Sequence, residues 1–276
     1  MLTCAKSRAG TSGQERRVMM DKSMRLSGKV AVVTGADVGL GRAVASRFGR
    51  EGAAVVAVDK NNRDGTTVAD EIRKMGGCGI FVKADVSQER EVLAALEAAF
   101  REFKSIDVLY NNAAVLSYEH DAEAHELSLD VWDQTMAVNL RGAFLCAKHA
   151  IPLMLKNGGG TIINLASPTG IIGCAPNLTA YSTSKAGILG LTRVMAASYA
   201  RKGIRVNAVV PGTMDTPMNN YLLVDDKKRE EYREAVPMGR LGLPSDIEGL
   251  AVFLASDESS YCTGGVFTCD GGLTAM

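Results

Sequence analysis

The sequence predicts an α/β protein: one domain built as a doubly wound parallel sheet with helices on both faces. From Lys29 onward, short β-branched runs alternate with longer amphipathic segments. Strands that alternate with helices through right-handed crossovers build such a sheet. The short runs are continuously apolar, which is typical of strands buried on both faces of a parallel sheet. A chain of 276 residues is long enough to bury a core of this kind.

Seven strands and six helices are expected in a domain that covers residues 26–276. In chain order, the strands are 30–34 (VAVVT), 54–59 (AVVAVD), 79–85, 106–112, 161–167, 204–212 and 264–272. The helical patterns lie near 40–51, 63–76, 88–104, 129–156, 181–202 and 244–255. The segment 213–240 has no strand pattern and is charged in its middle, so we expect a lid between the sixth strand and the last helix.

The composition argues against several function classes. Basic and acidic residues balance at 31 each, so we expect no nucleic acid as a partner. No run reaches the ~18 apolar residues of a membrane helix, so we expect no membrane association. The six cysteines are scattered singly, without a C-x-x-C pair or a histidine cluster, which indicates reduced thiols and no metal site. A cytoplasmic protein is the resulting expectation.

Residues 1–25 differ from the rest of the chain. They are rich in arginine, lysine, serine and glycine, and their longest apolar run is Val18-Met19-Met20. That run is too short for a secretory signal, and the acidic Glu15 and Asp21 argue against a mitochondrial presequence. We predict a disordered N-terminal extension, with an over-long start and a true beginning at Met24 as the alternative.

A glycine-rich turn follows the first strand, in TGADVGLG (34–41). Gly35, Gly39 and Gly41 let the backbone turn tightly and approach a pyrophosphate, whose charge lies at the N-terminus of the next helix. The spacing is G-x-x-x-G-x-G and not the commoner G-x-G-x-x-G. A plain strand-to-helix turn is the simpler alternative for a motif of this kind.

Acidic residues near this turn bear on the choice of cofactor. Asp59 ends the second strand, where a carboxylate can accept hydrogen bonds from an adenosine ribose and would repel a 2′-phosphate. Asp37 adds negative charge within the turn, whereas Lys60 is the one contrary feature. The pattern favours NAD over NADP.

Further polar residues end the third and fourth strands, in ADV (84–86) and NNAA (111–114). Ligands bind at the carboxyl ends of parallel strands. Asp85 and Asn112 can therefore contact the adenine, or they can cap the backbone of their own loops.

Tyr181 and Lys185, in YSTSK (181–185), lie one turn apart on the same face of a predicted helix. A free phenol has a pKa of ~10, too high to take a proton readily at neutral pH. An ammonium ~5 Å away at an effective dielectric constant of ~20 contributes ~3 kcal/mol, about two pKa units of depression. The pair is thus a candidate for general acid–base catalysis. Exposed Tyr–Lys pairs at this spacing are common on helices, so the pair taken alone favours a surface pair without function.

Two further polar residues are candidates for the same chemistry. Ser167 ends the fifth strand and can hydrogen-bond a substrate oxygen. Asn139 lies in MAVNLRGAF, within an otherwise apolar helix, where it lowers helix propensity. A water or hydrogen-bonding role is one interpretation of Asn139, and a capped kink is the other.

The ordered set of these motifs resembles the short-chain dehydrogenase/reductase family. It comprises TGADVGLG, Asp59, NNAA, Asn139, Ser167, YSTSK, PGTMDT (211–216) and the C-terminal stretch from GRLGLPSDIEG to CDGG. The resemblance covers about residues 26–276 and implies a Rossmann-like fold with NAD across the carboxyl ends of the strands. It also implies that the cofactor site includes Leu40 and Val86, Ala113 and Ala114 after the strands, and Pro211, Gly212, Met214 and Thr216.

The resemblance further implies roles for the catalytic residues in interconverting a secondary alcohol and a ketone. Tyr181 exchanges the proton, and Lys185 lowers its pKa and holds the nicotinamide ribose. Ser167 orients the reacting oxygen, and Asn139 positions a water of the proton relay. A homotetramer is implied as well, with an intersubunit bundle for which the candidate residues are Ala143, Phe144, Ala147, Leu189 and Leu191.

The sequence departs from the family pattern at two places. The usual NNAG is here NNAA, so Ala114 adds a methyl group near the cofactor. The separation of Ser167 from Tyr181 is one residue longer than usual, and a strict count from the tyrosine would reach Pro168. The S-x-x-G pattern ending at Gly170 selects Ser167, with Thr169 as a weaker substitute and the extra residue in the loop 171–180.

Two alternatives to a general NAD-dependent alcohol dehydrogenase stay open. A 3-oxoacyl thioester reductase fits the C-terminal third, although such enzymes usually take NADPH, which Asp59 opposes. A non-catalytic NAD-binding scaffold would be expected to lack Tyr181 or Lys185. The substrate pocket is expected to be largely apolar, with His120 and His125 facing solvent; its candidate lining residues are Leu116, Ile171, Leu178, Met218, Tyr221 and Leu222.

Overall fold

A seven-stranded parallel sheet forms the centre of the molecule, in the order β3-β2-β1-β4-β5-β6-β7. This computed structural model describes residues 24–61 and 67–276. The chain runs outward from β1 in one direction and then outward from β4 in the other, which is the doubly wound topology that the sequence predicts. The strands are β1 (Val30–Thr34), β2 (Ala54–Asp59), β3 (Gly79–Lys83), β4 (Val108–Asn111), β5 (Gly160–Leu165), β6 (Ile204–Pro211) and β7 (Val266–Cys269).

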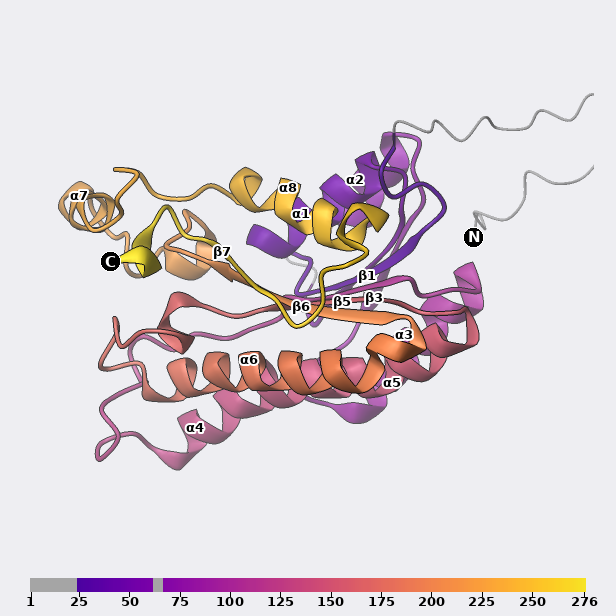
Figure 1. Ribbon diagram of the computed structural model, residues 1–276. Helices are drawn as coiled ribbons and strands as arrows, with labels where there is room; N and C mark the ends of the chain where they lie inside the picture. Colours follow the sequence, from indigo (N-terminus) through magenta and orange to yellow (C-terminus); the bar gives the residue numbers. More distant parts are fainter. Residues whose placement is uncertain (1–23, 62–66) are drawn as a thin grey trace, which may run out of the picture.

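Helices cover both faces of this sheet (Figure 1). One face carries α1 (Gly39–Arg50), α2 (Val68–Lys74) and α8 (Pro244–Ala255). The other carries α3 (Glu89–Phe103), α5 (Gly142–Lys156) and α6 (Thr179–Tyr199), with α4 (Leu129–Met136) leading into α5. The fold class is therefore as predicted: a single-domain, Rossmann-like α/β sheet with helices on both faces.

The sheet separates two large apolar clusters, one beneath each helical layer. In β1, Val30 and Val32 pack into one cluster, whereas Ala31 and Val33 pack into the other. Successive side chains of a strand point to opposite faces, so a strand covered on both sides must be apolar throughout. This burial accounts for the continuously apolar runs of the sequence.

The helix expected at 129–156 is interrupted. α4 passes into a π-helical turn at Ala137–Arg141 before α5 begins at Gly142. The sequence predicts one continuous helix because the residues of the π turn, AVNLR, include no glycine or proline that would mark an interruption. Such turns are frequently found at functional sites.

The expected lid, 213–240, contains a helix of its own. α7 (Asp226–Glu234) is capped by Asp225, whose carboxylate accepts a hydrogen bond from the Lys228 amide at 2.7 Å. Figure 1 shows α7 lying away from the sheet, on the side where the C-terminus ends. The charged residues that suggested an exposed lid are the residues of this helix.

Several expectations lie partly or wholly outside the described residues. The predicted extension 1–25 falls almost entirely there, as does the start of the helix expected at 63–76. Among the described residues, no helix combines the length and apolar character needed to cross a membrane. Cys146, Cys174, Cys262 and Cys269 are free thiols as expected, but Cys78 is disulfide-bonded, so the expectation of reduced cysteines is wrong at that position.

Candidate active site

A cleft of about 880 Å³ opens at the carboxyl ends of the strands. The strand order reverses between β1 and β4, and ligands bind in open α/β sheets at such a switch point. Most of the residues predicted for cofactor binding line this one cleft: Gly35, Gly39, Leu40, Asp59, Asp85, Val86, Asn112, Ala113, Ala114, Pro211, Gly212, Met214 and Thr216. Segments far apart in the sequence thus meet at one site.

Gly41 and Asp37 are the two predicted cofactor residues that do not line the cleft. A Cβ atom at Gly41 would lie 2.0 Å from the Gly35 carbonyl oxygen and 2.5 Å from the Asn112 amide nitrogen. Gly41 is therefore required for packing within the turn. Gly39, with φ at +59°, is different: the nearest atoms to its Cβ position belong to Thr216 and Pro217 and lie 3.7 Å or more away, which leaves space toward the cleft.

Asn112 holds the glycine turn in place. Its side-chain amide donates to the carbonyl oxygens of Thr34 at 3.0 Å and Gly35 at 2.9 Å. Of the two roles expected for Asn112, the structure therefore shows backbone capping. Asp85 behaves similarly, since its carboxylate accepts a hydrogen bond from the Ser87 amide at 2.8 Å.

Asp59 faces the cleft from the end of β2. Its two carboxylate oxygens accept hydrogen bonds from the backbone amides of Asp37 and Asn61, both at 3.0 Å. Asp37 is buried. The turn residue Asp37 thus positions the Asp59 carboxylate through its main chain, a role that the charge argument from the sequence did not anticipate.

The predicted catalytic residues Tyr181, Ser167 and Lys185 are all buried and line the same cleft. Ser167 hydrogen-bonds the Tyr181 phenol and accepts a hydrogen bond from the Thr169 hydroxyl at 3.1 Å. Lys185 lies with its Nζ 5.5 Å from the centroid of the Tyr181 ring. The structure therefore brings these three side chains together, and Ser167, not Pro168 or Thr169, is the residue bonded to the phenol.

The expected effect of Lys185 on the pKa of Tyr181 is not seen. Burial raises the pKa of Tyr181 to about 12, and only the hydrogen bond from Ser167 opposes that rise. Burial also lowers the pKa of Lys185 to about 8. The Lys185 ammonium donates to the Leu165 carbonyl oxygen at 2.9 Å. The sequence estimate was wrong because it treated the pair as partly solvated, whereas desolvation disfavours both charges.

Asn139 lies in the π-helical turn and is buried. Its side-chain amide donates to the Val115 carbonyl at 3.0 Å and to the Ser184 hydroxyl at 3.1 Å, and its oxygen accepts from the Val115 amide at 2.8 Å. Asn139 therefore joins the α4–α5 region to the loop after β4 and to α6. It does not itself line the cleft.

Asp121 is a site residue that the sequence reading missed. It is buried, and its carboxylate accepts hydrogen bonds from the amides of Ala180 at 3.0 Å and Tyr181 at 2.9 Å. These amides belong to the first turn of α6, whose N-cap residue is the apolar Leu178. The apolar side chain of Leu178 cannot accept hydrogen bonds from the first-turn amides of α6. This apolar residue before YSTSK is the sequence signal that could have indicated an acceptor from another part of the chain.

The far end of the cleft is formed by the loops expected to hold the substrate. Leu116, Leu178, Met218 and Leu222 line it as predicted. Ile171 and Tyr221 are not among its lining residues; Tyr221 instead stacks on Tyr118, with ring centroids 6.0 Å apart. His120 and His125 do not line it either, and both are exposed.

Comparisons with known proteins agree with this architecture. A family model described as enoyl-(acyl carrier protein) reductase matches residues 35–274. The uncharacterized oxidoreductase YxbG of Bacillus subtilis is 44% identical over 257 residues, which cover 91% of this chain and 93% of that protein. Glucose 1-dehydrogenase 2 of the same organism is 41% identical, covering 90% and 96% of the two chains.

A solved structure extends the likeness to three dimensions. It is from Beutenbergia cavernae, is described as a candidate NAD(P)-dependent gluconate 5-dehydrogenase and holds NADP at low occupancy. The TM-score is 0.85 at 38% identity, covering 92% of this chain and all of that one. With these matches over most of its length and with its parallel sheet, the chain belongs to the short-chain dehydrogenase/reductase family of oxidoreductases.

Proposed function

We propose that this protein is an NAD-dependent oxidoreductase that interconverts a secondary alcohol and a ketone. One observation carries the proposal: the buried Ser167, Tyr181 and Lys185 lie together in the cleft that also holds Asp59 and the glycine turn. A proton-transfer group and a dinucleotide-binding turn are thus on the walls of a single cavity.

The residues of the cleft fit a nicotinamide dinucleotide. Gly39 leaves room for a close approach to the first turn of α1, and helix N-termini favour phosphate. Asp59 suits the adenosine ribose, and Lys185 suits the second ribose. When bound, the cofactor supplies the acceptor or donor of the hydride.

The protein's own residues then handle the proton. Ser167 orients the substrate oxygen and stabilises the phenolate form of Tyr181 by a hydrogen bond. A tyrosine whose pKa is raised keeps its proton at neutral pH, so Tyr181 is suited to act as the general acid when a ketone is reduced. Asn139 holds the loop after β4 against α6, so we assign it a positioning role.

The preference for NAD over NADP is part of the proposal. It is supported by the Asp59 carboxylate, whose hydrogen bonds to two amides keep it at the cleft, where it would repel a 2′-phosphate. Lys60 also lines the cleft, but it is exposed, so its charge is screened by solvent. The protein of known structure with NADP bound is a relative and sets no preference for this chain.

A 3-oxoacyl thioester reductase is the alternative within the same family. The description of the matching family model includes an acyl-carrier-protein substrate. Asp59 opposes the NADPH that such reductases use, so we place this activity second. A non-catalytic scaffold is disfavoured, since Tyr181 and Lys185 are both retained in the cleft.

A substrate panel tests the proposed function. Purified protein is incubated with NAD and a set of secondary alcohols, and with NADH and the corresponding ketones, while absorbance of the reduced nicotinamide is followed. At least one alcohol–ketone pair is expected to turn over, with NADP supporting a lower rate than NAD. Binding of NADH without turnover of any compound would favour the scaffold.

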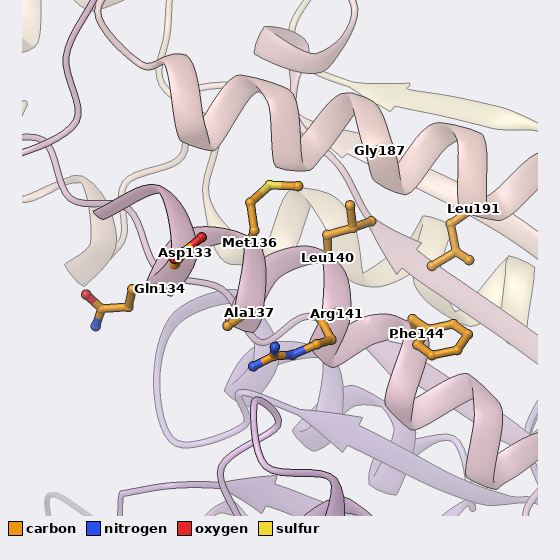
Figure 2. A pocket seen from close by; sticks show the side chains of 9 residues that line it. All are labelled: Asp133, Gln134, Met136, Ala137, Leu140, Arg141, Phe144, Gly187 and Leu191. Atoms are coloured by element: carbon orange, nitrogen blue, oxygen red, sulfur yellow. The ribbon is translucent and has the colours of Figure 1, made fainter. Parts of the chain in front are cut away.

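We also propose that two copies associate through the outer surface of α4, α5 and α6. A groove there is lined by Met136, Leu140, Phe144 and Leu191, with Asp133, Gln134 and Arg141 among its polar residues. In Figure 2, Leu140, Phe144 and Leu191 lie along the space between the two helical segments. Phe144 is 46% exposed in the single chain. Apolar surface of this kind favours association with a second copy.

Not all residues predicted for this bundle are available to a partner. Ala143, Ala147 and Leu189 are buried in the core of the single chain. Phe144 and Leu191 therefore remain as candidates. Phe144→Glu should lower the mass measured by light scattering at micromolar concentration, whereas Met75→Glu, at an exposed apolar residue after α2, should leave it unchanged. A monomeric wild-type mass would contradict this association and, with it, the homotetramer that the family resemblance implies.

A further inference from the structure

Charged residues line the cleft unevenly. Of the described residues that line it, Asp59, Lys60 and Asp85 stand at the ends of β2 and β3, and Lys185 is buried with its ammonium on a backbone carbonyl. The loops 115–128 and 171–180 and the lid 213–240 contribute no charged residue to the lining among the residues described. The half of the cleft beyond Tyr181 is thus uncharged.

The two loops and the lid do contain charged residues, although none of these lines the cleft. The loop 115–128 contains four acidic residues and two histidines, and α7 is almost entirely charged. From α7 itself, only Tyr232 lines the cleft. Arg229 instead forms an ion pair with Asp215 at 2.9 Å. The fold therefore turns the charges of these segments away from the site.

The polar side chains at this end are uncharged, and some already have partners; they include Tyr118, Thr169, Asn177, Thr213, Asn219 and Tyr232. The Asn219 amide donates to the Met214 carbonyl at 2.7 Å, and the Thr169 hydroxyl donates to Ser167. The surrounding side chains are mostly apolar: Leu116, Leu178, Met218, Leu222, Val236 and Leu273. A carboxylate or phosphate placed here would lose its hydration without gaining a cation, which is strongly unfavourable.

We infer that the substrate is an uncharged, largely apolar secondary alcohol or the corresponding ketone. This inference rests on the proposed function and names its substrate class. In the reduction, the carbonyl carbon would receive the hydride that a bound NADH supplies, and the carbonyl oxygen would receive the proton of the Tyr181 phenol, which is then replaced from solvent. The carbonyl double bond would become the C–O single bond of the secondary alcohol, with NAD as the oxidised product.

Matched compounds that differ only in charge test the inference. One pair is cis-4-hydroxycyclohexanecarboxylate and its methyl ester, and a second is 3-hydroxybutyrate and its methyl ester. For whichever pair turns over, kcat/KM should be at least tenfold higher for the ester, equivalent to about 1.4 kcal/mol. A carboxylate preferred in either pair would overturn the inference while leaving the proposed alcohol oxidation intact. If no secondary alcohol reduces NAD, the proposed function itself fails.

A variant of the lid makes the test independent of the natural substrate. Leu222 is half-buried and lines the cleft, so Leu222→Arg would place a cation at its uncharged end. The ratio of carboxylate to ester turnover should then rise at least tenfold over wild type. Leu222→Gln, which is polar but uncharged, serves as the matched control and should leave the ratio unchanged. An equal ratio in the arginine variant would contradict the assignment of this region.

A second inference comes from Asp121, through different contacts. Its carboxylate binds the amides of Ala180 and Tyr181, while the Thr179 hydroxyl donates to the Ala122 carbonyl at 2.6 Å. The loop after β4 is thereby joined to the first turn of α6, the turn that contains the catalytic phenol. We infer that Asp121 is a positioning residue that sets the location of Tyr181 in the cleft.

Graded substitutions separate positioning from simple stabilisation. Asp121→Asn retains one acceptor oxygen and Asp121→Ala retains none, so kcat should fall in the order Asp, Asn, Ala, by about tenfold or more for alanine. The NADH dissociation constant should stay within about twofold, since Asp121 does not line the cofactor half. Glu119→Ala, at an exposed position in the same loop, is the control. A lower melting temperature with unchanged kcat per folded molecule would reduce Asp121 to a structural cap.

Discussion

Helices α1 and α6 both begin at the cleft, yet their first turns differ in how the backbone amides are satisfied. Within residues 38–42, α1 has the apolar N-cap Val38, no side-chain cap and no acidic residue in its first turn. In α6, the N-cap Leu178 is also apolar, but Asp121 supplies a carboxylate from another loop. Two helices with apolar N-cap residues thus differ: α1 has an open end, without a side-chain cap, and α6 has a closed end, capped by Asp121.

We expect this difference to let one cleft bind a pyrophosphate at α1 and hold a proton-transfer residue at α6. The first turn without a side-chain cap and the positive end of the dipole at α1 favour an anion. At α6 the Asp121 carboxylate already accepts hydrogen bonds from two first-turn amides, so we expect this end to hold Tyr181 in place and not to attract an anionic substrate. The uncharged lining beyond Tyr181 agrees with that division.

The largest expected effect is at the closed end. Tyr181→Phe keeps the ring and removes only the hydroxyl, so turnover should fall by about 10³-fold, within the usual range for a general acid or base. NADH binding, measured by fluorescence titration, should be unchanged because the open end is untouched. If the Tyr181→Phe variant kept most of its activity, the closed end would not hold the proton-transfer residue, and the proposed difference in function between the two helix ends would be wrong.

Burial of charge at the closed end predicts a pH-dependent stability. The pKa of Lys185 is lowered from 10.5 to about 8, so the folded state disfavours the ammonium and is destabilised below pH 8. As pH rises from 8 toward 10.5, the unfolded chain holds more protons at this residue and stability should increase, by about 3 kcal/mol in total.

Lys185→Met isolates this contribution. Chemical unfolding followed between pH 7 and 10 should show wild type gaining stability relative to the methionine variant, because other titrating groups cancel in the difference. Parallel curves for the two proteins would mean that Lys185 is solvated, as the sequence estimate assumed.

Closing the open end should weaken cofactor binding. Val38→Asp places a carboxylate at the N-cap of α1, where it can accept hydrogen bonds from the first-turn amides and stabilise the helix by about 1 kcal/mol. Its charge should reduce NADH affinity by about tenfold to thirtyfold, as measured by calorimetry. Val38→Asn caps the helix without adding a charge, so its loss of NADH affinity should be smaller. Unchanged affinity in the aspartate variant would show that the α1 terminus does not contact the pyrophosphate.

The smallest effect concerns cofactor choice beside the open end. Wild type should bind NADH about tenfold or more tightly than NADPH, equivalent to one contact of about 1.4 kcal/mol. Asp59→Ala should reduce the ratio of NADH affinity to NADPH affinity, and Lys60→Ala should leave it unchanged. Parallel titrations with the two reduced cofactors measure this ratio. Equal affinities in the wild-type protein would contradict a preference set by Asp59.

Much of the fold and site could be predicted from sequence because the signals are local. A continuous apolar run indicates each buried strand. The glycine turn and YSTSK are also local patterns, since each lies within eight consecutive residues or fewer. Strand boundaries were less accurate: the strands expected at 79–85 and 106–112 end at Lys83 and Asn111. The polar residues just beyond, which the sequence assigned to the strands, begin the loops that line the cleft.

The sequence by itself determined the doubly wound sheet and the order of the site motifs, and it was enough to select Tyr181, Ser167 and Lys185 as candidates for catalysis. Only the tertiary structure decided the environment of those residues. The cap from Asp121 spans about 60 residues of chain, and the pKa of Tyr181 depends on burial by several elements at once. Hydrogen bonds between distant segments and desolvation are properties of the packed molecule, so no local pattern contains them.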